Sequence, residues 1–343
     1  MRTGAYQEAE KHFDKVIGGL EATLYPVSSR PDNTEKHTGI ARSHVPAELI
    51  TAFCRHNGVT PSNYFLTVLM HVLWRVTRED GVLITTIHNG RDDARMQESY
   101  GMLVKTLPVS MTGKGSESFA KSVLDVQRQV AESADRSLYP FTHIVSRHGV
   151  RPNVMYAYQG IQDYTTGEDS GLLAGATSIP LEPDTAKLPL AVDVRPTADG
   201  FELIAEYDTA MYCRSDMDTM LAMTRGLALN AAAEDGAFSK DIPLLSEADR
   251  EKTILLGQGE KMEYDRSKTW VDLFIAMAKE HGDSVAVADK ERRLTYAELD
   301  AMSDYVAHVL MDKGVKPEDF VAIMLDRTVR FNVAVLATHK AGA

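Results

Sequence analysis

A long polar segment near residue 250 divides the sequence into two parts that must fold separately. The stretch KDIPLLSEADREKTILLGQGEKMEYDRSKT (240–269) is mostly polar and has no sustained hydrophobic period. Such a segment predicts a linker, with a short helix near Ser246–Leu255. The 343 residues suffice for two or more folding units, which we place in residues 1–245 and 268–343, with the linker in residues 246–267.

Composition limits the class of protein. Hydrophobic residues make up 44% and charged residues 25%, as in ordinary globular chains. The net charge of −12 argues against non-specific binding to nucleic acid or to anionic membranes, because both need a basic surface. The N-terminus has no signal-peptide core, and no apolar stretch is long enough to cross a bilayer. Neither Cys54 nor Cys213 belongs to a CxxC pair, so we expect a reduced cytoplasmic protein.

Hydrophobic periodicity predicts alternating helices and strands in the first part. Thr60 is a suitable N-cap, and Pro61 suits the first position of the helix that follows. The expected helices are Tyr6–Leu24, Pro46–His56, the apolar segment after Pro61, Ser116–Asp135 and Asp216–Asp235. The expected strands are Val82–Ile87, 102–110, 153–160 and a hairpin formed by 188–194 and 201–207 around the turn TADG.

The second part reads as the opening of an alternating α/β layer. The pattern predicts helices at 270–280, 296–313 and 329–340, and strands at 284–289 and 320–325. Thr295 and Glu298 form a capping box in front of the middle helix, and their role is structural.

Several motifs of the first part follow one another in a familiar order. TTIHNGR (85–91) precedes SYGMLVKTLPV (99–109), and SLYPFTHIV (137–145), TAKLPLAVDV (185–194) and ELIAEYDTAMY (202–212) follow. This order resembles the C-terminal half of a condensation domain of a nonribosomal peptide synthetase, whose motifs include GR, IGMFVNT and YPF. The matching residues are Gly101, Met102, Val104, Thr106, Tyr139, Pro140 and Phe141, and Lys105 replaces the family's asparagine.

The second part resembles the start of an adenylation domain. RRLTYAELD (292–300) matches the first motif of that family, KAGA (340–343) matches the start of the second, and IPLLSEADREK (242–252) is similar to the usual linker. The resemblance implies an α/β chain: the C-terminal lobe of a chloramphenicol-acetyltransferase-like condensation fold, with a mixed sheet and helices, followed by a truncated α/β piece of an adenylation domain.

The resemblance also implies a function. Condensation domains form an amide when a carrier-bound amine attacks a carrier-bound thioester, and the protein supplies mainly proximity and orientation. Their paired histidine motif is missing, because none of the eleven histidines is adjacent to another. We therefore expect a fragment without a catalytic residue of its own, inactive in isolation. The implied partners are carrier domains that deliver 4'-phosphopantetheine and the other synthetase domains, and ATP and magnesium belong only to a complete adenylation domain.

In the resemblance, residues 89–106 form part of the floor of a substrate tunnel between two lobes. Glycine lets the backbone approach a pantetheine arm, Met102 and Leu103 supply an apolar wall, and Thr106 can bond an amide of the arm. The expected channel residues are Asn89, Arg91, Gly101, Met102, Leu103, Lys105, Thr106, Tyr139 and Phe141. Without the resemblance, the segment predicts a plain strand with Lys105 in solvent.

Alternatives stay open at several positions. Arg91 either pairs with a carboxylate across the lobes or is a solvated loop residue. His88 with Asp92 is interpreted as a strand-end histidine, and His71 as a core histidine with its bonds satisfied. Tyr139-Pro140-Phe141 favours a packing corner. No cluster has metal-ligand spacing.

Two other functions compete with the first. An epimerisation domain shares the fold, and PNVMYAYQG (152–160) is similar to its NYLG strand, but the adenylation start argues against it. A non-catalytic remnant that docks carrier domains is the other alternative.

Overall fold

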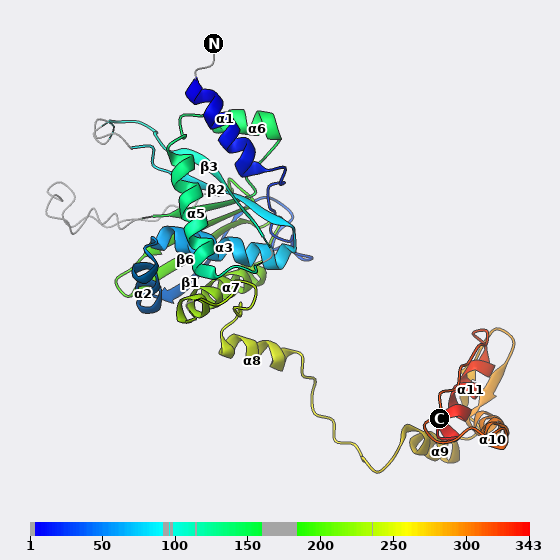
Figure 1. Ribbon diagram of the computed structural model, residues 1–343. Coiled ribbons are helices and arrows are strands. Elements are labelled where there is room, and N and C mark those ends of the chain that lie inside the picture. The colour runs from blue at the N-terminus through cyan, green and yellow to red at the C-terminus, as the bar shows by residue number, and fades with distance from the viewer. Residues whose placement is uncertain (1–3, 92–95, 97–98, 114, 160–183, 235) are drawn as a thin grey trace. The chain divides into compact units, whose positions relative to one another are not determined.

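The computed structural model describes residues 4–91, 96, 99–113, 115–159, 184–234 and 236–343. They belong to two compact units, Met1–Gln258 and Gly259–Ala343 (Figure 1). No helix among the described residues combines the length and the apolar character needed to cross a membrane.

The first unit is built on a mixed six-stranded sheet of order β1-β6-β5-β4-β2-β3. Its strands are β1 (Thr38–Pro46), β2 (Gly81–His88), β3 (Lys105–Thr112), β4 (Val154–Tyr158), β5 (Leu190–Pro196) and β6 (Gly200–Asp208). Strand β4 runs parallel to both β2 and β5, and the remaining pairs are antiparallel. The mixed sheet with helices agrees with the fold class expected from the sequence.

Helices pack on the sheet and form two separate apolar clusters with it. The larger cluster joins the sheet to α2 (Ala47–Asn57), α3 (Pro61–Thr77), α5 (Phe119–Ala134) and α7 (Arg214–Ala233). The smaller cluster joins α1 (Gly4–Ile17) and α6 (Phe141–His148), which lie side by side in Figure 1, to β2 and β3. Val82 and Ile84 belong to the first cluster and Leu83 to the second, so β2 is buried on both faces.

Helix α3 is the central helix of the larger cluster, and its start follows from local chemistry. The Thr60 hydroxyl accepts the Asn63 N–H, and Pro61 occupies the first helical turn, as expected. Every residue from Tyr64 to Leu73 is buried. A helix that is apolar all round must be surrounded, which explains its place in the interior.

Side chains from two helices close both edges of the sheet. At β3, the Gln129 amide accepts the Ser110 N–H at 2.8 Å and donates to the Ser110 carbonyl at 3.2 Å. Pro108, two residues earlier on the same edge, has no N–H to offer. At β1, Arg214 and Arg225 of α7 donate to the carbonyls of residues 40 and 44. Part of the backbone on each edge is therefore already bonded, which disfavours pairing with another strand.

The second unit has a small core. Its elements are α9 (Trp270–Glu280), β7 (Val285–Ala288), β8 (Arg293–Thr295), α10 (Tyr296–Asp312) and α11 (Val329–Lys340). Strands β7 and β8 form a two-stranded antiparallel sheet. Leu299, Val333 and Leu336 form one buried cluster, and the expected capping box of Thr295 and Glu298 is present.

The structure corrects three expectations and adds two elements to the first unit. The first helix ends at Ile17 rather than Leu24, because Gly18 and Gly19 take φ values of 55° and 80° that a helix cannot continue. Strand β1 and helix α6 were not predicted. The expected strand 102–110 begins only at Lys105. Residues 320–325 form no strand, because among the described residues no strand lies beside them.

Candidate functional site

The β2–β3 hairpin presents the segment that the sequence assigned to a substrate channel. Its two strands pair in register up to His88 opposite Lys105, and the loop between them contains Asn89 to Val104. Within that loop the structure describes residues 89–91, 96 and 99–104. Asp92, the expected companion of His88, lies outside the described residues.

A glycine lets the two arms of this loop meet. Gly90 has a φ of +67°, and a Cβ placed on it would lie 2.1 Å from the carbonyl oxygen of Leu103. Any other residue would therefore strain the backbone and push the arms apart. The Asn89 side chain accepts the Arg91 N–H at 3.1 Å and so fixes the turn.

Arg91 bonds three of the described residues of the loop. Its guanidinium donates to the backbone carbonyls of Met96, Ser99 and Gly101 at 2.5, 2.8 and 3.4 Å. These bonds hold the loop to the end of β2. Within the described residues they make Arg91 an organiser of the loop, whereas the sequence had offered a pairing across lobes or a solvated side chain.

The loop turns apolar side chains outward. Tyr100 is 105% exposed and Met102 93% exposed, and Val104 is also exposed. Gly101 has a φ of +140°, and nothing lies within 4 Å of where its Cβ would be. The loop thus offers an apolar, open surface with accessible backbone, which suits contact with another molecule.

The base of the loop is more enclosed. Leu103, Lys105 and Thr106 are half-buried, and Lys105 and Thr106 are the first two residues of β3. Lys105 stands opposite His88, so the one lysine of the motif sits at the junction of loop and sheet.

Tyr139 and Phe141 lie in a different place from the loop. Tyr139 is buried between α1 and α6, with its ring 4.8 Å from that of Tyr6 and 5.7 Å from that of Phe13. Burial and the nearby Glu10 raise the pKa of the Tyr139 hydroxyl. Phe141 packs against the same cluster. The structure therefore divides the predicted site residues into a hairpin loop and a helix-packing corner.

An ion-pair group locks that corner. Arg147 of α6 donates two bonds to the Asp14 carboxylate of α1, at 2.7 and 2.8 Å, and His148 lies 2.8 Å from the same carboxylate. The Arg147 bond is the main reason that the pKa of Asp14 is lowered. These exposed pairs tie α6 to α1 and need no catalytic role.

His71 corrects the sequence interpretation. It lies in the core of α3 and is only 3% exposed, as expected, yet neither ring nitrogen has a hydrogen-bond partner in the described structure. Its ring instead lies 5.5 Å from the Phe119 ring and 6.1 Å from the Trp74 ring. Burial lowers the pKa of His71 to about 4, so the ring is neutral at pH 7.

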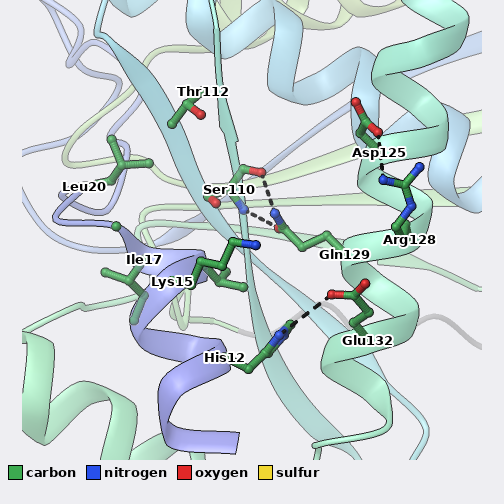
Figure 2. A pocket seen from close by; sticks show the side chains of 12 residues that line it. His12, Lys15, Ile17, Leu20, Ser110, Thr112, Asp125, Arg128, Gln129 and Glu132 are labelled. Atoms are coloured by element: carbon green, nitrogen blue, oxygen red, sulfur yellow. Dashed lines mark hydrogen bonds and ion pairs between the residues drawn. The ribbon is translucent and has the colours of Figure 1, made fainter. Parts of the chain in front are cut away.

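A groove that the sequence did not indicate lies between α1, β3 and α5, with a volume of about 530 Å³. Figure 2 shows His12 and Lys15 on α1 facing Gln129 and Glu132 on α5. The His12 Nε2 lies 2.9 Å from the Ser133 hydroxyl, and its Nδ1 lies 3.9 Å from the Glu132 carboxylate. Burial lowers the pKa of His12.

This arrangement resembles a nucleophile, a base and an orienting acid, but Ser133 is fully buried. A buried hydroxyl cannot reach a substrate, so we interpret the contact as a tie between α1 and α5. His12 and Ser133 stand 121 positions apart, and no local pattern could have paired them. Among the described residues, no group of three or more His, Cys, Asp or Glu side chains could hold a metal ion.

Comparison with known proteins follows the same division of the chain. The family model described as Condensation domain matches residues 3–254, and the model described as AMP-binding enzyme matches residues 274–343.

Among curated proteins, tyrocidine synthase 3 of Brevibacillus parabrevis is 27% identical over 98% of this chain and 5% of its own length. Surfactin synthase subunit 1 of Bacillus subtilis (strain 168) is 25% identical over 85% of the chain and 8% of its own length. The chain thus spans less than a tenth of these two relatives.

Solved structures show the same fold. A holo four-domain nonribosomal peptide synthetase bound to AMP and glycine matches with a TM-score of 0.75 at 15% identity, over 100% of this chain and 28% of that one. The first condensation domain of the CDA synthetase matches with a TM-score of 0.57 at 16% identity, over 71% of this chain and 55% of that one. The chain therefore belongs to the condensation-domain family of nonribosomal peptide synthetases and carries after it the start of an AMP-binding domain.

Proposed function

We propose that residues 1–245 are the C-terminal part of a condensation domain, residues 246–267 a linker and residues 268–343 the truncated N-terminal part of an adenylation domain. In the complete domain, this part supplies one wall of a tunnel in which two carrier-bound acyl groups are joined by an amide bond. The proton-handling histidine motif belongs to the other lobe, so the isolated chain is inactive.

The partners follow from that reaction. Peptidyl or acyl carrier domains bring both acyl groups on 4'-phosphopantetheine arms, and ATP with magnesium acts only in a complete adenylation domain. The work takes place in the cytoplasm, with neither nucleic acid nor a membrane as partner.

The exposed loop is the observation that carries this proposal. Tyr100 and Met102 are almost fully exposed on the described part of the loop, where Arg91 bonds the carbonyls of Met96 and Ser99. Large apolar side chains that are exposed favour a contact surface, because leaving them in water is unfavourable. Asn89, Arg91, Gly101, Met102, Leu103, Lys105 and Thr106 form or support this wall, whereas Tyr139 and Phe141 support it only through α6.

Amide formation within a complete module tests the role of the loop. Met102→Asp places a charge on the proposed wall and should lower the yield of carrier-bound amide, measured by mass spectrometry, by roughly tenfold or more. The matched control is Leu256→Asp, at a leucine that is 88% exposed, which should leave the yield unchanged. Equal yields from both variants would contradict the proposed wall.

Two further measurements separate the alternatives. If the chain alone forms amide from supplied carrier thioesters, the inactive-fragment proposal is wrong. If the complete module exchanges the substrate's α-hydrogen and inverts its configuration without forming amide, it is an epimerisation domain. Binding of a loaded carrier domain without either reaction would identify a docking remnant.

A further inference from the structure

The six residues Lys240–Leu245, here named the strap, lie at the end of the first unit in what the sequence presents as polar linker. The strap is bonded to α3, to α7 and to the loop that precedes α5. Ile242 within it is fully buried, and the Lys240 N–H donates to the Gly115 carbonyl at 3.1 Å. A segment that is bonded through its backbone and held by a buried side chain behaves as part of a fold and not as a free tether.

Arg75 of α3 holds the first half of the strap. Its guanidinium donates to the Ile242 carbonyl and, at 3.0 Å, to the Lys240 carbonyl. The fork of an arginine suits two neighbouring acceptors, and such charge-assisted bonds are stronger than neutral ones.

Asn230 of α7 holds the second half. Its side-chain amide donates to the Pro243 carbonyl at 2.9 Å and to the Leu245 carbonyl at 3.2 Å. Strap carbonyls that no strand or helix satisfies are thus bonded one after another by side chains of α3 and α7.

A glycine in α7 makes room for the strap. Gly226 lies inside the helix, where glycine is unfavourable, and a Cβ on it would stand 2.2 Å from the Leu244 carbonyl oxygen. Its φ is an ordinary helical one, so the backbone gives no reason for glycine at this position. The close approach of the strap to α7 is the reason for a glycine here, because a side chain would collide with the Leu244 carbonyl.

The bonds that tie the strap to α3 and α7 end at Leu245. Ser246 caps α8 (Glu247–Leu256), and α8 has no buried residue. We propose that the strap is an integral anchor of the first unit, which couples the positions of α3 and α7 to the point where α8 begins. This inference rests on the strap's own contacts and stands whether or not the proposed reaction is correct.

Gly226→Ala tests the anchor by the sign of its effect. If the strap were passive, alanine would favour the helix, raise the Tm of the first unit and leave the rate of cleavage after Lys240 unchanged. If the strap is integral, the new methyl group displaces it, so the Tm should fall by about 3 °C or more. Calorimetry of the full chain measures the Tm, and Thr219→Ala, at an exposed position of the same helix, is the matched control.

Limited trypsin digestion of the full chain gives a second readout. In the unaltered protein, cleavage should occur at exposed α8 residues such as Arg250 and Lys252 and not after Lys240. Gly226→Ala and Asn230→Ala should raise the cleavage rate after Lys240 by roughly tenfold, because cleavage follows the population of the opened segment. The rates at Arg250 and Lys252 serve as the internal reference.

Arg75→Met is the stronger variant and Asn230→Ala the milder one, because each loses two bonds to the strap but those of the Arg75 guanidinium are charge-assisted. A Gly226→Ala protein with a raised Tm and a protected Lys240 would overturn the proposal. So would an Asn230→Ala protein that folds and keeps Lys240 uncut.

Discussion

The two units of the chain differ in how far they bury their large apolar side chains. The first unit buries one large cluster around α3 and closes both edges of its sheet with side chains from α5 and α7. The second unit has only a two-stranded sheet and leaves Phe320 and Met324 at 105% and 95% exposure. The same kinds of residues are thus satisfied in one unit and uncovered in the other.

This difference shows what a local pattern can and cannot determine. FVAIML (320–325) has a strand's composition as clearly as VLITTI (82–87) does. Only residues 82–87 form a strand, β2, because β3 and β4 lie on either side of it. The second unit relies instead on local devices, such as the Thr295 cap and the bonds from Lys340 to Asp300 and Asp304. Two-stranded sheets with small cores are marginal, so the units should differ in stability.

Core truncations in each unit should have the largest effects on stability and should show whether the two units unfold independently. Leu69→Ala removes a buried side chain from α3 and should cost the first unit about 2–5 kcal/mol. Leu336→Ala should lower the melting of the second unit alone. Calorimetry of the full chain should show two transitions, the lower one from the second unit. A single transition that both variants shift equally would contradict independent units.

Acid should weaken the first unit through His71. Its folded-state pKa is about 4, below the ordinary 6.5, so the unfolded chain takes up a proton in this interval while the folded chain does not. Stability therefore falls as the pH drops from 6.5 to 4, by about 3 kcal/mol in total.

The matched variant is His71→Leu, which removes two buried nitrogens that have no partners in the described structure. Urea unfolding at pH 7 and pH 4.5 should show a smaller loss for this variant, together with a modest gain at pH 7. An unchanged pH dependence would show that other groups, such as Asp14, dominate the acid response.

Long periodic elements could be predicted from the sequence, whereas single-residue exceptions could not. Helix α3 and the β5–β6 hairpin combine hydrophobic period with a cap or a turn. Strand β1 was missed because its sequence, TGIARSHVP, alternates weakly and its stability comes from pairing with β6, far along the chain. The end of α1 at Gly18 was missed because the hydrophobic period continues to Leu24, whereas the helical backbone stops where Gly18 takes a positive φ.

The site was predictable only in part for a related reason. The hairpin loop is local, so one motif brings Asn89, Arg91 and Gly101 together, and the bonds among them agree with that grouping. Tyr139 was assigned to the same channel, yet it packs on Tyr6 of α1, which lies 133 positions earlier. Contacts of such sequence separation leave no local signal, so side-chain roles across elements had to come from the structure.

Removing the Gln129 side chain that bonds the edge of β3 should have a smaller effect on stability. Gln129→Ala removes both bonds to the Ser110 backbone and should cost about 1 kcal/mol. It also frees an edge for pairing between molecules, so light scattering at elevated concentration should rise faster than in the unaltered chain. Arg128→Ala, on the neighbouring position of α5, is the control and should do neither. Equal scattering from both variants would mean that Pro108 and the strand's short length already suffice to protect the edge.

The hairpin loop should give the smallest effect on stability, although it carries the proposed function. Met102 is 93% exposed, so Met102→Ser removes almost no buried surface and should change the free energy of unfolding by less than about 0.5 kcal/mol. Gly90→Ala, where the added Cβ meets the Leu103 carbonyl, should cost more than Met102→Ser, although both lie in the same loop. Urea unfolding of the two variants measures the contrast. A large loss from Met102→Ser would place this side chain in a buried contact of the folded chain, and the loop would then be part of the core and not a surface for a partner.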